Sequence, residues 1–230
     1  MSSLLGGPWP PVGWSAGWIE APKDEVETAL ADWREADQSN PSDLTVEPLT
    51  DCWPECLQQL LPLEAPWTTE LLVEHGGRWT CYLNNDLNGG DAFPVVGRFA
   101  AHMSWRGVIS VHQPRTPVGH ASTQLQLFGP QGEPPLMYVR TIAAQAEDGR
   151  RSWHESGRPQ WFEHVERYSR RLKRDRLDRQ LLVEYLLALG IDVDNDAAYG
   201  ASTLIRQRVT WSTRKQTLPE ARKEWGLSRR

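Results

Sequence analysis

The sequence contains little cysteine and no long hydrophobic run. Its three cysteines, Cys52, Cys56 and Cys81, are an odd set that cannot all pair within one chain. No apolar stretch approaches the ~20 residues that a membrane-spanning helix needs, and residues 1–8 lack the charged and hydrophobic regions of a secretion signal. Chains without such signals usually keep their thiols reduced. We therefore predict a cytoplasmic protein that has no disulfides and no membrane partner.

Familiar catalytic and nucleotide-binding motifs are also missing. The chain has no H-E-x-x-H, no P-loop and no G-x-G-x-x-G spacing. Catalytic groups brought together from distant positions remain an alternative, because such sites are recognised by geometry and not by order in the sequence. We predict no cofactor and assign no catalytic residue.

The cysteines raise the question of a metal site. Cys52 and Cys56 would share one face of a helix, with Cys81 and either His75 or His102 as further zinc ligands. The paired ligand spacings of zinc motifs are absent, and buried free cysteines are common core residues. We therefore predict no metal site.

The composition is that of an ordinary globular protein. With 230 residues, 39% of them hydrophobic and 24% charged, the chain can bury a substantial core in one domain. Residues 1–22 are rich in proline, glycine and tryptophan, which predicts an arm that either packs over the domain as a strap or docks on a partner. We predict a single α+β domain over residues 23–212 and a basic tail over residues 213–230.

The stretch Trp67–Gln113 has the clearest secondary-structure pattern. It predicts strands over Thr69–Glu74 and Trp79–Leu83 joined by a Gly76-Gly77 turn, a helix over Ala92–Trp105 and a buried strand over Val108–His112. This order describes a hairpin followed by a strand-helix-strand crossover. We expect the flanking regions to pack around this unit.

The flanking patterns complete the predicted fold. Alternating residues predict strands over Thr123–Leu127 and Leu136–Ala144, in a sheet of about five to seven strands. Helical spacing predicts helices over Asp24–Ala36, Trp161–Leu172 and Asp178–Leu189. The predicted fold class is α+β, with a mainly antiparallel sheet, helices packed on one side and a C-terminal helical pair.

Two stretches, Trp79–Phe93 (WTCYLNNDLNGGDAF) and Leu181–Tyr199 (LLVEYLLALGIDVDNDAAY), resemble a group of uncharacterised actinobacterial proteins. In that group a strand ending in Asn or Asp leads to a Gly-Asp turn and a helix, and a later helix ends in a Gly-Ile turn. The resemblance covers the middle and the end of the chain but not the arm. It implies an α+β fold and, since no activity is established for the group, no site.

The most polar connection of the central unit is the loop Asn84–Asp91. It joins a strand end to a helix start, a position where backbone N–H groups often bind ligands. The predicted ligand-binding or partner-binding residues are Asn84, Asn85, Asp86, Asn88 and Asp91. The alternative is an ordinary turn, because Asn, Gly and Asp are also the residues that a turn needs. An enzyme site near this loop is a further alternative.

A basic stretch, Arg167–Arg179, is the strongest electrostatic feature. Arg170, Arg171, Lys173 and Arg174 predict an alternative role in nucleic-acid contact, with nearby aromatic residues available for stacking. A sequence pI of about 5.7 argues against nonspecific nucleic-acid affinity. A solvated helix face that pairs with acidic residues of the same chain would show the same pattern.

Charge and tryptophan content favour a role in protein binding. Residues 1–100 contain 4 basic and 16 acidic residues, whereas residues 101–230 contain 21 basic and 14 acidic residues. Tryptophan and arginine are enriched at binding hot spots, and the chain has 12 tryptophans. We predict a non-enzymatic interaction protein, of an inhibitor or immunity type, that presents its acidic half and exposed tryptophans to a basic protein.

Overall fold

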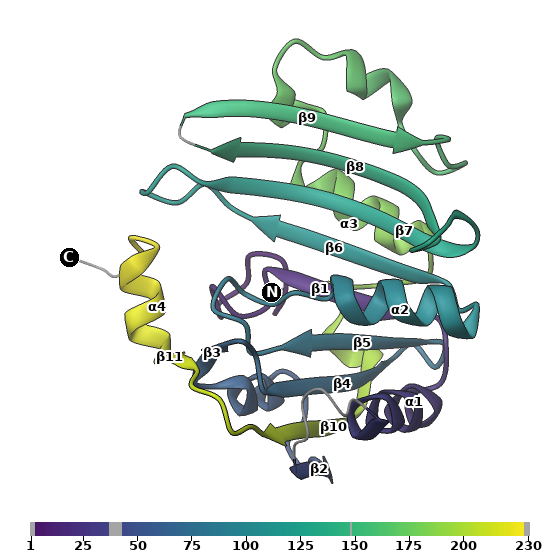
Figure 1. Cartoon of the computed structure of the whole chain (residues 1–230). Helices are drawn as coiled ribbons and strands as arrows, with labels where there is room; N and C mark the ends of the chain where they lie inside the picture. The colour runs from purple at the N-terminus through teal and green to yellow at the C-terminus, as the bar shows by residue number, and fades with distance from the viewer. Residues whose placement is uncertain (1–2, 37–42, 148, 228–230) are drawn as a thin grey trace.

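An antiparallel sheet of nine strands organises the described part of the chain (Figure 1). The computed structural model describes residues 3–36, 43–147 and 149–227. The strand order is β2-β10-β4-β5-β1-β6-β7-β8-β9. The strands are β1 Ser15–Ile19, β2 Asp43–Pro48, β4 Thr69–His75, β5 Trp79–Asn84, β6 Gly107–Gln113, β7 Ala121–Glu133, β8 Tyr138–Glu147, β9 Arg150–Gly157 and β10 Tyr199–Arg208. With 27% helix and 36% strand, the predicted α+β class is confirmed.

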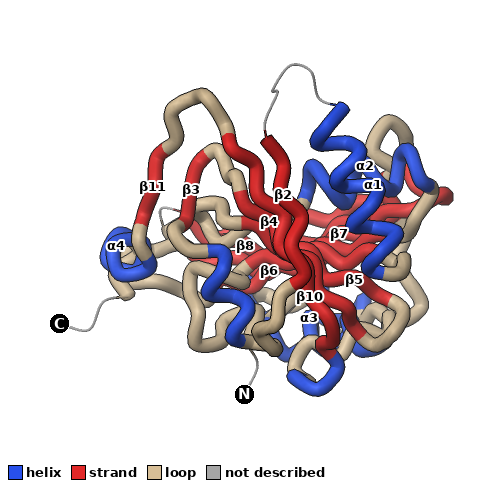
Figure 2. Tube along the Cα trace, turned by 90° about the horizontal axis from the view of Figure 1, so that it is seen from below, coloured by secondary structure: helices blue, strands red, loops and turns tan. Residues whose placement is uncertain are grey.

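Helices cover both faces of this sheet (Figure 2). The α-helices are α1 Lys23–Ala36, α2 Phe93–Met103, α3 Arg179–Ala188 and α4 Leu218–Glu224, and the 3-10 helices are η1 Glu55–Leu60, η2 Val165–Ser169, η3 Lys173–Asp175 and η4 Asp196–Ala198. One core joins α1 and α2 to Leu72 and Ile109, and a second core joins α3 to Leu71 and Val108. The prediction of helices on one side is therefore wrong. Successive strand residues are apolar on both faces, so both faces have to be covered.

The predicted N-terminal arm contributes the central strand. β1 lies between β5 and β6, and all of its residues are buried. A Cβ atom at Gly17 would lie 2.8 Å from the Val96 side chain, so this glycine lets α2 pack closely on β1. Trp18 Nε1 donates a hydrogen bond to Ser110 Oγ at 2.9 Å. Residues 15–19 are thus part of the sheet and not an appendage.

The predicted central unit is confirmed with one addition. β4 and β5 form a hairpin in which His75 lies opposite Trp79, and α2 connects β5 to β6. Because β1 is antiparallel to both neighbours, β5 and β6 run parallel, as the predicted crossover requires. The addition is β1, which lies between the two strands that the crossover joins.

The predicted C-terminal helical pair is not confirmed. The helix expected over Trp161–Leu172 is replaced by loops and the short η2, whereas α3 forms close to its predicted position. Three residues of the stripe that the helix was expected to bury are exposed, namely Trp161 (81%), Val165 (48%) and Leu172 (49%). The segment is held instead by Glu163, whose carboxylate accepts hydrogen bonds from the Arg140 guanidinium and the Gln160 N–H.

The predicted basic tail is also structured as far as residue 227. β11 (Arg214–Gln216) pairs with β3 (Leu63–Ala65) in a separate small sheet. Thr217 and Glu220 form a capping box at the start of α4. Trp225, at the end of α4, contacts the Trp14 ring edge-on at 5.2 Å. The tail therefore packs against the residues that precede β1.

Candidate functional site

Asn84 and Asn85 hold the polar loop in place. Both side chains are buried. Asn85 Oδ1 accepts hydrogen bonds from the N–H groups of Thr68 and Thr69, each at 3.0 Å. Asn84 Oδ1 accepts from the Asp91 N–H at 3.0 Å, and Asn84 Nδ2 donates to the Asp91 carbonyl at 2.7 Å. These two predicted site residues therefore position the loop, and their amides are occupied.

Asp86, Asn88 and Asp91, the other predicted site residues, line an open groove of about 420 Å³. Asp86 Oδ1 accepts from the Asn88 N–H at 3.0 Å, and Asp91 Oδ1 accepts from the Phe93 N–H at 3.1 Å. Within the described chain, the second oxygen of each carboxylate has no partner. Desolvation of the carboxyl raises the pKa of Asp91 above its ordinary value, and the neighbouring Asp86 adds to the shift.

The rest of the groove comes from the sheet. Its lining includes Ile109, Val111 and Gln113 on β6 and Gln124 and Gln126 on β7. Val111 lies opposite Gln124, and Ile109 lies opposite Gln126. Sequence reasoning misses these residues. The alternating pattern of β7 indicates that one face of the strand is solvent-exposed, but it does not reveal which strand pairs with β7.

The loop reaches the start of β1 through a glycine. Gly89 has a φ of +90°, which favours glycine, and a Cβ atom there would collide with the Pro11 carbonyl. The Ser15 N–H donates to the Gly89 carbonyl at 3.2 Å. Trp14 and Ser15 consequently line the groove together with the loop.

Sequence reasoning also misses Gly13-Trp14-Ser15-Ala16-Gly17, which has the G-x-S-x-G spacing of a nucleophile elbow. An elbow requires the serine to lie between a strand and a helix, whereas Ser15 begins the strand β1. The lining of the groove contains no histidine, cysteine or lysine. The cleft that the enzyme hypothesis needs is present, and Ser15, Asp86 and Asp91 line it.

Three cross-strand rows run from the groove to β9 and contain no Asp, Glu, Lys or Arg, with His154 as their one ionisable residue. They consist of Ile109-Gln126-Thr141-Ser156, Val111-Gln124-Ala143-His154 and Gln113-Ser122-Gln145-Ser152. Opposite residues in an antiparallel sheet share one face, so these side chains point to the side on which α1 and α2 pack. Figure 1 shows that no helix of the described ranges lies over β8 and β9 on this side.

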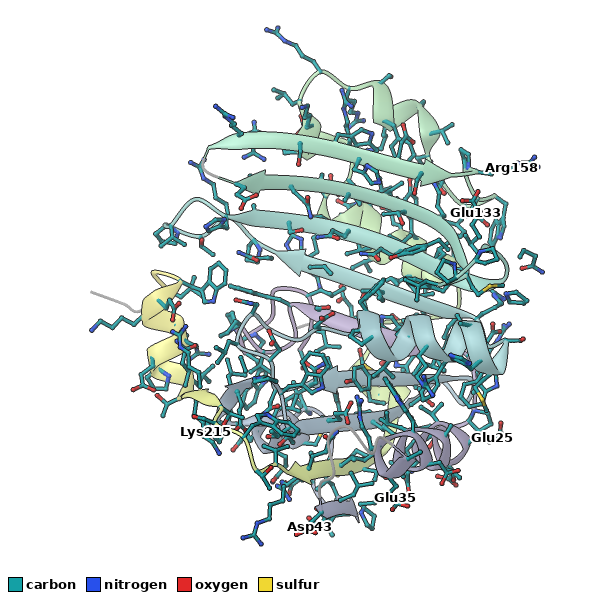
Figure 3. All side chains as sticks on the ribbon, in the orientation of Figure 1. Glu25, Glu35, Asp43, Glu133, Arg158 and Lys215 are labelled. Atoms are coloured by element: carbon teal, nitrogen blue, oxygen red, sulfur yellow. The ribbon has the colours of Figure 1, made fainter. Side chains whose placement is uncertain are left out.

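An acidic edge is formed by α1 and β2, which contact each other at one end of the sheet. Four of its exposed carboxylates have no ion-pair partner within the described chain: Glu25, Asp32, Glu35 and Asp43. Figure 3 shows Glu25, Glu35 and Asp43 along this edge, with Arg158 at the opposite end. β10, which comes from the basic half of the sequence, lies beside β2 and pairs Arg206 with Glu47, so the fold partly compensates the charge asymmetry at this edge.

The predicted nucleic-acid-binding residues differ in the hydrogen bonds and ion pairs that they form. Lys173 Nζ donates to the Arg151 carbonyl at 2.8 Å. Arg174 pairs with Asp175 at 3.4 Å, and Arg170 donates to the Asp175 carbonyl at 3.4 Å. Arg171 is exposed and has no partner within the described chain. The stretch thus presents three exposed guanidinium groups, while its lysine is held against β9.

Most tryptophans belong to the interior. Trp14, Trp18, Trp53 and Trp79 are buried, and Trp161 is the single exposed tryptophan, since the remaining seven are half-buried. Trp53 stacks on Tyr199 with ring centroids 3.9 Å apart. The exposed tryptophans on which the protein-binding hypothesis partly rested are therefore absent, apart from Trp161.

The three thiols are free, with Cys52 exposed and Cys56 and Cys81 buried. Over the described ranges, no three His, Cys, Asp or Glu side chains are grouped so as to hold a metal ion. In the same ranges no helix has the length and apolar character to cross a membrane.

Comparison with protein-family models, with curated proteins and with solved structures found no match.

Proposed function

We propose that this chain is a non-enzymatic interaction protein that binds a basic partner protein through its acidic edge. The observation that supports the proposal is the position of Glu25, Asp32, Glu35 and Asp43 on α1 and β2 at one end of the sheet, where none of the four forms an ion pair within the described chain, although Arg208 lies opposite Asp43. Unpaired surface charges of one sign attract partners of the opposite sign and speed their association.

The burial of the tryptophans makes this contact mainly electrostatic. Val46, on β2, is 37% exposed and is the single large hydrophobic side chain of α1 and β2 that is exposed. Pro48 lies at the end of β2, and Glu47 is paired with Arg206 at 3.0 Å. Prolines and charges on an edge strand oppose β-pairing with another chain. The proposal therefore involves side-chain contacts and not extension of the sheet.

The test measures binding of a fluorescent oligo-arginine peptide to the full chain by anisotropy. The variant replaces the four edge acids: Glu25→Gln, Asp32→Asn, Glu35→Gln and Asp43→Asn. The matched control removes the same charge from exposed glutamates elsewhere: Glu133→Gln, Glu147→Gln, Glu166→Gln and Glu184→Gln. We expect the edge variant to bind the peptide about tenfold more weakly than the wild type does. We expect the control variant to bind it with the wild-type affinity. Equal weakening by both sets would show that net charge alone governs binding.

A second candidate function is nucleic-acid contact through Arg170, Arg171 and Arg174. The exposed guanidinium groups and the exposed Trp161 favour it, since arginine and aromatic side chains suit phosphates and unstacked bases. We expect replacement of the three arginines by alanine to weaken binding of single-stranded DNA and to reduce its salt dependence. Unchanged mobility of the DNA in a gel-shift experiment would remove this candidate.

A further inference from the structure

Two residues that line the groove, Trp14 and Gln113, each carry a hydrogen-bond donor that has no acceptor within the described chain. Trp14 is 1% exposed, and its indole Nε1 is buried without a partner. The side-chain Nε2 of Gln113 is also buried without a partner. Buried donors are paired in most folded proteins, because an unpaired donor is destabilising. Both groups therefore point to a ligand that supplies acceptors.

The same groove also offers unpaired acceptors. The second oxygens of Asp86 and Asp91 have no partner in the described chain. Gln126 Nε2 donates to Gln124 Oε1 at 3.3 Å, which leaves Gln126 Oε1 free to accept. The residues that line this groove of about 420 Å³ thus include both unpaired donors and unpaired acceptors.

Few ligand groups satisfy such a lining. Two carboxylates, Asp86 and Asp91, oppose an anionic ligand. A guanidinium or ammonium group donates only and leaves Trp14 and Gln113 without acceptors. A hydroxyl group donates one hydrogen bond and accepts others, so neighbouring hydroxyls can satisfy both kinds of group.

The surface next to the groove extends this chemistry. The three rows across β6 to β9 offer serine, threonine and glutamine side chains, and the helix-free side of β8 and β9 leaves them accessible (Figure 1). Gln145, Ser152 and Ser156 are exposed. The charged pair Glu147 and Arg150 lies in the next row of this face, whereas the three rows themselves contain no Asp, Glu, Lys or Arg and suit a neutral chain that carries many hydroxyls.

We propose that the groove and the adjoining face of β7 to β9 bind a neutral, hydroxyl-rich ligand, namely a saccharide chain. This site is distinct from the acidic edge of α1 and β2. An extended peptide fits less well, because peptides that join a sheet bind main-chain groups at an edge strand. The edges of this sheet are β2 and β9, whereas the groove lies on a face near β1.

The test is an NMR titration of the full chain that follows the indole N–H of Trp14 and the side-chain amide of Gln113. Trp14→Phe identifies the indole resonance. The probes are neutral hexasaccharides of α-linked glucose, β-linked glucose, N-acetylglucosamine and mannose at millimolar concentration. We expect at least one probe to shift both resonances in a saturable manner, with equal affinity at low and high salt.

Gln126→Ala is the binding variant, and Gln58→Ala is its control because Gln58 is an exposed glutamine on η1. We expect Gln126→Ala to weaken binding about tenfold and Gln58→Ala to leave it unchanged. The spectra themselves show whether each variant is folded. If none of the four saccharides shifts the two resonances, or if an oligo-arginine or oligo-alanine peptide shifts them instead, the assignment to a saccharide is overturned. The salt-insensitive result also separates this site from the acidic edge, so either proposal can fail alone.

Discussion

The half of the sheet from β2 to β1 differs from the half from β7 to β9 in what covers its front face. α1 packs on the first half, where Leu72, Tyr82 and Ile205 are fully buried, and α2 packs on β1, β6 and β7. On the same side, the second half presents glutamine, serine and threonine in uncharged rows. Exposed carboxylates lie at the covered end, and uncharged donors and acceptors lie at the bare end. One continuous sheet therefore carries two surfaces of different chemistry.

Each half also contains a buried ion pair. At the covered end Arg34 pairs with Glu70 at 2.6 Å, and Glu70 also accepts from the Tyr82 hydroxyl at 2.7 Å. At the bare end Arg140 pairs with Glu163 at 2.7 Å. The Arg34 side chain is 13% exposed, the Arg140 side chain is 2% exposed, and both glutamates are fully buried. The bare end is thus held together by the more deeply buried pair.

The largest expected effect comes from breaking the pair at the bare end. Arg140→Met leaves the buried Glu163 carboxylate without its cation and should lower the free energy of unfolding by about 3–5 kcal/mol. Urea denaturation measures the change, with Arg158→Met as the control because Arg158 is exposed and has no ion-pair partner within the described chain. A loss of less than about 1 kcal/mol, as at an exposed ion pair, would contradict the comparison.

A smaller loss of stability is expected at acidic pH from His75, a buried residue of the covered half. Its imidazole contacts the rings of Trp18 and Tyr199, and neither ring nitrogen has a hydrogen-bond partner among the described residues. Desolvation lowers the pKa of His75 from 6.5 to about 4, against an opposing effect of Asp192. The unfolded chain therefore binds a proton at a pH where the folded chain does not. This stabilisation is complete above pH 6.5 and is lost as the pH falls towards 4.

His75→Phe removes that pH dependence. Between neutral pH and pH 4, the wild type should lose roughly 3 kcal/mol more stability than the variant. Desolvation also lowers the pKa of His112 to about 4, so the variant keeps part of the acid sensitivity. Thermal or urea unfolding across this pH range measures the difference, and His102→Gln serves as the exposed control. Parallel curves of stability against pH for the wild type and His75→Phe would show that His75 does not cause this acid sensitivity.

The sequence predicts the elements whose patterns are local. The β4-β5 hairpin, α1, α2 and α3 appear close to their predicted bounds, because turn glycines and apolar stripes are visible within each segment. Ser15–Ile19 is not predictable in this way. A strand buried on both faces has no alternating pattern, and its proline-rich and glycine-rich surroundings suggest an arm.

The groove depends on contacts between distant segments. Asp86, Asn88 and Asp91 are recognisable as loop residues, and Asn84 and Asn85 as polar residues at a strand end. The structure separates the three that line the groove from the two that hold the loop. Gln113 and Gln126 join the groove only through the register of β6 and β7, which no local pattern reveals. Trp161 shows the converse case. Its spacing fits the buried face of a helix, but the segment forms no such helix and the side chain is exposed.

The most direct test of the proposed function is a salt titration of oligo-arginine binding to the wild type and to the two fourfold variants. Binding at the acidic edge predicts that the wild-type and control affinities fall steeply as salt rises, while the edge variant binds weakly at every salt concentration. An affinity that does not change with salt, or identical curves for the edge and control variants, would contradict the proposal.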